Sequence, residues 1–88
     1  MSIYSIFDKK ANVHRSFMAC SDDATALRSV ARVANDGNSD LFMYCDDFAI
    51  YNLGDVNINS GVITPVSPII FVCNVSSLVT SVKGVESN

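Results

Sequence analysis

The 88-residue sequence has no tryptophan, a single histidine and only two prolines, and it contains no long apolar run. The longest unbroken run, residues 69–73, falls far short of the roughly 20 residues that a membrane-spanning helix needs. The apolar stretch near the N-terminus, residues 3–7, is too short for a signal peptide, and charges follow it rather than precede it. We therefore expect a soluble, cytoplasmic protein that does not contact a membrane.

Cysteine and charge are also sparse. Three cysteines, an odd number without a CxxC spacing, indicate neither a disulfide framework nor a zinc site. Charged residues make up 17% of the chain, and six Lys and Arg against nine Asp and Glu leave a formal net charge of −3. This balance excludes a strongly basic packing peptide that binds phosphate through bulk charge, but it leaves room for a local basic patch.

Residues that carry catalysis or hold metals are equally few. The only histidine is His14, and no family signature surrounds Cys20, the cysteine that precedes a predicted helix and that we interpret as structural. The spacing of Asp55, Asn57 and Asn59 matches the start of a calcium-binding loop, but the glycine and glutamate that such a loop needs are missing. A turn with Asx hydrogen bonds explains the same residues. We expect no enzyme activity, no cofactor and no bound metal.

Apolar residues account for 49% of the chain, in patterns typical of strands and one helix. β-branched and aromatic residues predict strands at residues 3–7 and 13–18, joined by a polar turn. Ser21 offers a helix N-cap, and an apolar stripe at helical spacing predicts a helix over residues 22–36. Gly37 can take the left-handed conformation that ends this helix. The stripe consists of Leu27, Val30, Ala31 and Ala34.

The second half of the chain predicts further strands and turns. Residues 39–47 show no steady period, and we interpret them as a crossover on the surface. A strand is predicted over residues 48–53, with Gly54 ending it, and a turn leads to a short strand at residues 62–64. The two prolines then interrupt the chain before the last strand, residues 69–75, whose unbroken apolar character indicates a central position in the sheet.

Together these elements predict one α+β domain over residues 1–79, in which an amphipathic helix packs on a small, mainly antiparallel β-sheet. Residues 80–88 are predicted to form a flexible tail. Because so short a chain has a small core, and association commonly stabilises small cores, we also expect a homo-oligomer.

The positive charges are unevenly distributed, since five of the six Lys and Arg lie before residue 33. Arg28 and Arg32 lie four residues apart on the predicted helix, either as ordinary helix surface or as an edge that contacts phosphate. Three more belong to the first predicted hairpin. Two tyrosines offer rings that either pack in the core or stack on bases. The candidate nucleic-acid-binding residues are Lys9, Lys10, Arg15, Arg28, Arg32, Tyr4 and Tyr51.

The order of several segments resembles a known family. The segments are YSIFDKKA at 4–11, DA at 23–24, ALRS at 26–29, AND at 34–36, DFAIYNLGD at 47–55 and SGVITP at 60–65. In order and spacing they resemble the small non-structural protein of gokushoviruses, which belong to the Microviridae, phages with single-stranded DNA genomes. No single segment is chemically diagnostic.

The resemblance implies a non-enzymatic accessory protein of DNA replication in the cytoplasm of a bacterial host. Such proteins are likened to protein C of the ΦX-type coliphages, which helps to switch replication from duplex to single-strand synthesis. Our first hypothesis is therefore binding to single-stranded DNA, or to phage or host replication proteins. The alternative is an oligomeric protein-interaction module without direct nucleic-acid contact. Charge reversal of Arg28 and Arg32 tests the assignment of those two residues.

Overall fold

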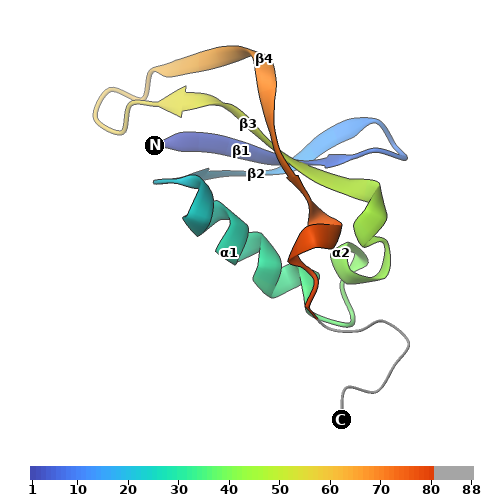
Figure 1. Ribbon diagram of the computed structural model, residues 1–88. Coiled ribbons are helices and arrows are strands. Elements are labelled where there is room, and N and C mark those ends of the chain that lie inside the picture. Colours follow the sequence, from blue (N-terminus) through green and yellow to red (C-terminus); the bar gives the residue numbers. More distant parts are fainter. Residues whose placement is uncertain (81–88) are drawn as a thin grey trace.

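A four-stranded antiparallel sheet packs one of its faces against a single main helix (Figure 1). The computed structural model describes residues 1–80, and this arrangement confirms the predicted α+β fold. The elements in chain order are β1 (Ser2–Asp8), β2 (Val13–Cys20), α1 (Asp23–Ala34), α2 (Asp40–Met43), the 3-10 turn η1 (Cys45–Asp47), β3 (Phe48–Val56), β4 (Ile63–Asn74) and the 3-10 turn η2 (Val75–Leu78). The strand order is β2-β1-β3-β4, so β1 and β3 are central and β2 and β4 are edges.

The core lies between α1 and the face of the sheet that the helix covers. Successive residues of a strand point to opposite faces, so Tyr4 and Ile6 of β1 share the helix side, as the alternation predicts. Ile50 of the neighbouring strand β3 lies opposite Ile6 and is fully buried. The helix contributes a buried stripe of small residues. This stripe starts at Ala26, one residue before the predicted start at Leu27. This stripe consists of Ala26, Val30 and Ala34, with Leu27 and Ala31 half-buried beside it.

The start of α1 differs from the prediction by one residue. The N-cap is Asp22, not Ser21, because the Asp22 carboxylate accepts a hydrogen bond of 2.8 Å from the backbone N–H of Thr25. The hydrogen bonds from Thr25 lower the pKa of the Asp22 carboxyl, and the positive charge of Arg28 adds to this effect.

Asn35, the C-cap of α1, links the end of the helix to a distant segment of the chain. The side-chain amide of Asn35 donates to the carbonyl of Ala31 at 2.8 Å and to that of Leu78 at 2.9 Å. The helix therefore ends at Ala34, two residues before the predicted end. Gly37 is not among the residues with a positive φ, so it does not form the predicted left-handed cap.

Residues 39–47, which we interpreted as an irregular crossover, contain α2 and η1. Ser39 caps α2, since its hydroxyl accepts from the backbone N–H of Phe42 at 3.1 Å. Leu41 and Cys45 reach back into the core and are buried. The apolar residues of this segment, 41–45, follow one another without a break and therefore show no helical period.

Strand β3 continues past Gly54, where the sequence indicated its end. Gly54 has a φ of +148° and faces Pro65 across the β3–β4 ladder, and a Cβ at this position would lie 2.8 Å from the Pro65 Cα. Glycine is thus used here for close approach between two strands rather than for a turn.

The sequence prediction differs most from the structure at strand β4, where two separate strands and a central position were expected. It is one strand of 12 residues that includes both Pro65 and Pro68, and it bends over the sheet (Figure 1). It lies at the edge and not at the centre, with most of its residues exposed. An edge strand tolerates proline because its outer side needs no backbone donor.

The chain after β4 packs against the end of α1 through η2. Thr80, the first residue of the predicted tail, is bonded to Asn35. The backbone N–H of Thr80 donates to the side-chain oxygen of Asn35 at 2.7 Å, and the Thr80 hydroxyl donates to the same oxygen at 3.1 Å. The other residues of the predicted tail, 81–88, lie outside the described part of the chain. Within residues 1–80, the helices are all too short or too polar to cross a membrane.

Candidate nucleic-acid interface

Four ring side chains, one from each strand, lie together on the face of the sheet opposite α1. They are Phe7 of β1, His14 of β2, Tyr51 of β3 and Phe71 of β4, and we call them the ring row. Cross-strand pairing brings them together, because Phe7 lies opposite His14, and Tyr51 lies opposite Phe71. The alternation that directs Tyr4 toward the helix directs Phe7 away from it.

The rings contact one another mostly edge to face. The centroids are 4.6 Å apart for Phe7 and His14, 5.6 Å for His14 and Tyr51, and 5.8 Å for Tyr51 and Phe71. Such contacts hold each ring in place without covering all of its faces. Phe71 is 51% exposed, and the other three are half-buried. The row therefore presents aromatic surface to solvent.

A buried hydroxyl orients one member of the row. Ser5, which lies on the same face of β1, is fully buried, and its Oγ is 2.7 Å from Nδ1 of His14. Ser5 also lies directly opposite Tyr51 in the β1–β3 ladder. The hydroxyl thus fixes the imidazole beside the Tyr51 ring.

One predicted cation, Lys9, reaches this face. Its ammonium group donates a hydrogen bond of 3.2 Å to the side chain of Asn74, and its backbone N–H donates to the carbonyl of Asp47 at 2.8 Å. Asn74 lies opposite Ala49, and Ala49 lies opposite Phe7. The three residues therefore lie side by side on the face of the sheet opposite α1, which we call the open face. A positive charge is therefore placed next to the ring row.

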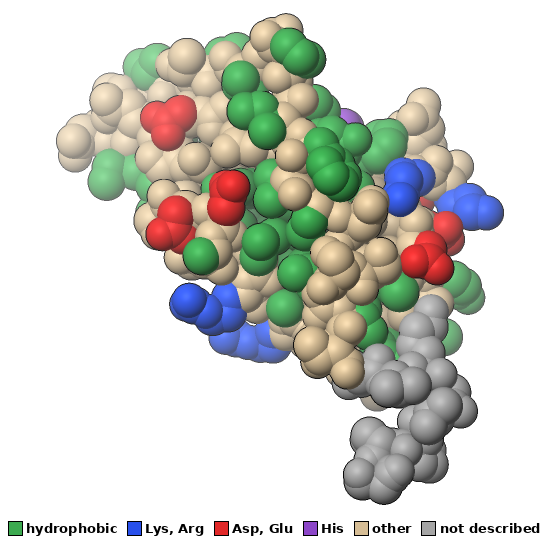
Figure 2. All heavy atoms as spheres, viewed as in Figure 1, with side chains coloured by type: hydrophobic (Ala, Val, Ile, Leu, Met, Phe, Trp, Pro, Cys, Tyr) green, Lys and Arg blue, Asp and Glu red, His purple; other side chains and the backbone are tan. Residues whose placement is uncertain are grey.

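The structure separates the remaining predicted cations from the row. Figure 2 shows Lys and Arg side chains in two groups, one over α1 and one over the turn between β1 and β2. Arg28 and Arg32 are exposed on α1, on the opposite side of the sheet. Lys10 and Arg15 line a hollow on the helix side, and the Arg15 guanidinium lies 5.2 Å from the centroid of the Phe48 ring. The lining of this hollow also contains the carboxylates of Asp8, Asp40 and Asp47.

The two predicted stacking residues lie in different environments. Tyr51 belongs to the ring row, whereas Tyr4 is fully buried and offers no ring face to a base. The Tyr4 hydroxyl donates a hydrogen bond to the carboxylate of Asp23 at the start of α1. Burial, together with this hydrogen bond, raises the pKa of Tyr4 to about 12. Tyr4 is a core residue, and we leave it out of the site.

Sequence reasoning did not assemble the ring row. Alternation in residues 3–7 was the signal for Phe7, because it placed that ring on the face opposite Tyr4. Phe71 was hidden inside an apolar run that suggested burial. His14 was considered for catalysis and not as part of an aromatic surface, because its neighbours on the sheet come from other strands.

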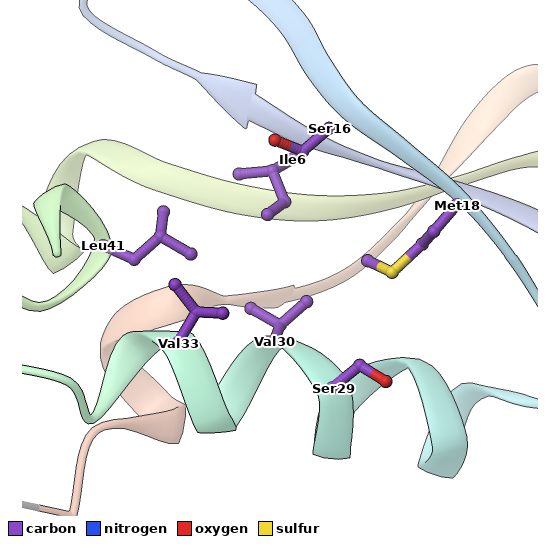
Figure 3. A pocket seen from close by; sticks show the side chains of 7 residues that line it. All are labelled: Ile6, Ser16, Met18, Ser29, Val30, Val33 and Leu41. Carbon is purple, nitrogen blue, oxygen red and sulfur yellow. The ribbon is translucent and has the colours of Figure 1, made fainter.

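A second hollow, of about 210 Å³, lies between α1 and the sheet on the helix side (Figure 3). Figure 3 shows side chains from α1, β1, β2 and α2 pointing into it, and hydroxyls are its only polar groups. Its lining consists of Ile6, Ser16, Met18, Ser29, Val30, Val33 and Leu41. With no ionisable side chain in the lining, we assign it no chemistry.

The possible calcium loop forms a turn. The side-chain oxygen of Asn57 accepts hydrogen bonds from the backbone N–H groups of Asn59 and Ser60, at 2.9 and 3.1 Å, which is the Asx geometry. Among residues 1–80, no cluster of three or more His, Cys, Asp or Glu is arranged to hold a metal ion.

Comparison with known proteins identifies one family for the chain. The family model described as phage ORF5 protein matches residues 1–78 of the chain. Neither a curated protein nor a solved structure matches it.

Proposed function

The chain belongs to the phage ORF5 protein family, and on that premise we propose that it is an accessory protein of single-stranded DNA genome replication that binds single-stranded DNA on the open face of its sheet. The sequence resemblance to the small non-structural protein of gokushoviruses supports this proposal. It also supports action in the cytoplasm of a bacterial host, without catalysis.

The ring row is the observation that carries the proposal. Phe71 is 51% exposed within strand β4, and its ring contacts that of Tyr51, which in turn contacts Phe7 and His14. Base stacking on exposed aromatic side chains is a general mode of single-strand recognition and tolerates any sequence, because every base has a π-face. Other four-stranded sheets stack two or three bases on aromatic residues of this kind.

The charge of the protein favours modest affinity for DNA with a shallow dependence on salt. Lys9 is the one predicted cation that the described structure places beside the row, where its ammonium group can contact a phosphate. The formal net charge of −3 opposes long-range attraction of DNA. Stacking therefore contributes more to binding than phosphate contacts, and the dependence on salt is shallow compared with that of basic DNA-binding proteins.

The test is fluorescence anisotropy with labelled single-stranded and duplex oligonucleotides, at low salt and then across a salt series. We expect preferential binding of the single strand, and a loss of about five- to one-hundredfold in affinity for Phe71→Ala. Tyr44→Ala is the matched control, because Tyr44 is a 54% exposed ring that lines the hollow on the helix side. Absence of binding at low salt would refute direct DNA contact.

The edge strand favours a second candidate, a protein-interaction module. Strand β4 carries no charged residue, and it exposes Ile63 and Ile70 by 61% and 50%. Figure 2 shows hydrophobic side chains exposed along the path of β4. An uncharged edge can pair with another strand, and a second copy of this chain would satisfy the homo-oligomer proposal.

Light scattering at tens of micromolar, roughly the range for such association, tests this candidate. We expect a dimer that Ile63→Lys combined with Ile70→Lys converts to a monomer. A wild-type monomer would contradict self-association, and a pull-down with phage and host replication proteins would then test the remaining partners.

A further inference from the structure

His14 places an imidazole, a side chain that can carry a positive charge, in the ring row. Its ring lies 4.6 Å from that of Phe7 and 5.6 Å from that of Tyr51, centroid to centroid, so it lies within the proposed DNA-binding surface. Imidazole side chains gain and lose a proton between about pH 5 and 8. An imidazolium at this position would add a positive charge to the proposed site.

The contact with Ser5 allows the ring to hold its position in both protonation states. Nδ1 of His14 is 2.7 Å from the Ser5 hydroxyl, which is fully buried. A hydroxyl can donate to an unprotonated ring nitrogen and accept from a protonated one. Uptake of a proton therefore requires no change of rotamer.

The second ring nitrogen is available for a ligand. Within residues 1–80 no hydrogen bond to Nε2 of His14 is formed, and the side chain is only half-buried. In the charged imidazole Nε2 carries a proton, and a charge-assisted hydrogen bond to an anion is roughly twice as strong as a neutral one. A phosphate oxygen of DNA that crosses the row is an anion of this kind.

Within residues 1–80, no ion pair is formed with the His14 ring. From β1, His14 is faced by Phe7 and Ser5, and from β3 by Tyr51, whose phenol is the titratable group among these contacts. The Asp8 carboxylate accepts hydrogen bonds from the backbone of the adjacent turn.

Other charges near the ring lie elsewhere. The next residue of β2, Arg15, lies over the Phe48 ring on the helix side, and Lys9 is bonded to Asn74 of β4. In the described part of the chain, the only ion pair joins the N-terminal ammonium group and Asp55.

We propose that His14 contacts a DNA phosphate as the imidazolium, so that binding of single-stranded DNA to the open face takes up a proton. This inference rests on the proposed function and adds to it a pH dependence and a residue. Because no carboxylate of residues 1–80 is paired with the ring, the phosphate is the partner that stabilises the charged form. Affinity then falls as pH rises through the range in which imidazoles lose their proton.

The experiment is anisotropy with short labelled oligo(dT), whose bases carry no group that titrates in this range, at constant ionic strength. We expect affinity to weaken by about tenfold between about pH 5.5 and pH 8, the effect of one charge-assisted hydrogen bond. His14→Phe keeps an aromatic ring in the row and should bind equally at both pH values. His14→Gln, which can still hydrogen-bond to Ser5, should do the same.

Lys9→Gln is the matched control, because lysine stays charged throughout this range, and its loss of affinity should be equal at both pH values. Calorimetry in two buffers of different ionisation enthalpy measures the proton uptake directly, which should disappear in His14→Phe. If wild type binds DNA without pH dependence, or if His14→Phe keeps the pH dependence, the inference is wrong while the proposed function stands. If wild type does not bind at any pH, both are wrong.

Discussion

The two faces of the sheet carry similar residues and use them differently. Tyr4 on the helix side is fully buried, and its hydroxyl is bonded to Asp23. Tyr51 on the open side keeps exposed surface and contacts other rings at their edges. The residue type is the same, so the face of the sheet decides whether an aromatic ring stabilises the fold or remains available for a ligand.

The strongest test of this difference compares neighbouring residues of β3. Ile50→Ala removes a fully buried side chain from the core, and we expect it to lower the free energy of unfolding by about 2 to 5 kcal/mol. That is a large part of the stability of a small domain. Urea denaturation followed by circular dichroism measures the loss. A loss below about 1 kcal/mol would show that the site relaxes more freely than a packed core does.

Tyr51→Ala, one position along the strand, should weaken DNA binding strongly and lower stability only a little. We expect affinity for single-stranded DNA to fall by about tenfold or more, with a stability loss of about 1 kcal/mol, because a stacking ring is lost from a half-exposed surface. Anisotropy and urea denaturation of the same preparation separate the two effects. A loss of stability equal to that of Ile50→Ala would place Tyr51 in the core and contradict the distinction between the faces.

Removing the hydroxyl of Tyr4 should give a smaller and pH-dependent effect. Tyr4→Phe should cost about 1 kcal/mol near neutral pH, because it removes one hydrogen bond to a carboxylate. The pKa of Tyr4 is raised to about 12 in the folded protein, against about 10 for tyrosine in an unfolded chain. The folded state therefore favours the neutral phenol, whose contribution is complete below pH 10 and is lost as pH rises toward 12.

Denaturation of wild type and Tyr4→Phe at about pH 8 and above pH 10 checks this, and wild type should lose more stability than the variant over that interval. Tyr51→Phe, which removes a hydroxyl from the open face, is the control. An equal alkaline loss in wild type and Tyr4→Phe would show that Tyr4 is not its source.

The smallest effect is expected for the arginines of α1. Arg28→Glu with Arg32→Glu should leave DNA affinity unchanged within about twofold at physiological salt, where charges beyond about 8 Å are largely screened. These residues lie on the side of the sheet opposite the ring row. Lys9→Glu, beside the row, should weaken binding in the same anisotropy assay. A larger loss for the arginine pair than for Lys9→Glu would move the site to α1.

Local patterns predicted much of the fold. Residues 3–7 alternate between two faces, and the stripe of α1 repeats at helical spacing, because both depend on bond geometry within a few residues. The hydrogen bond from Asn35 to the Leu78 carbonyl was not predictable in this way, because Leu78 lies 43 residues further along the chain. The position of β4 was likewise missed, because an apolar run does not reveal which strands lie beside it.

The candidate site was predicted less completely than the fold. Lys9 and Tyr51 were chosen as types that bind phosphate and base, and the structure places both on the open face. Arg28 and Arg32 were chosen on the same grounds, but the helix carries them to the other side of the sheet. Charge and aromaticity are properties of single residues, whereas a surface is a property of neighbours.

The sequence by itself determined that this chain forms strands and one amphipathic helix, because the strand period of 2.0 residues and the helix period of 3.6 residues are local properties. It also determined the scarcity of charge that makes strong phosphate attraction unavailable. Only the tertiary structure decided that Phe7, His14, Tyr51 and Phe71 form one row, and that Ser5 holds the imidazole. Strand order and register decide this, and both arise from contacts between distant parts of the chain.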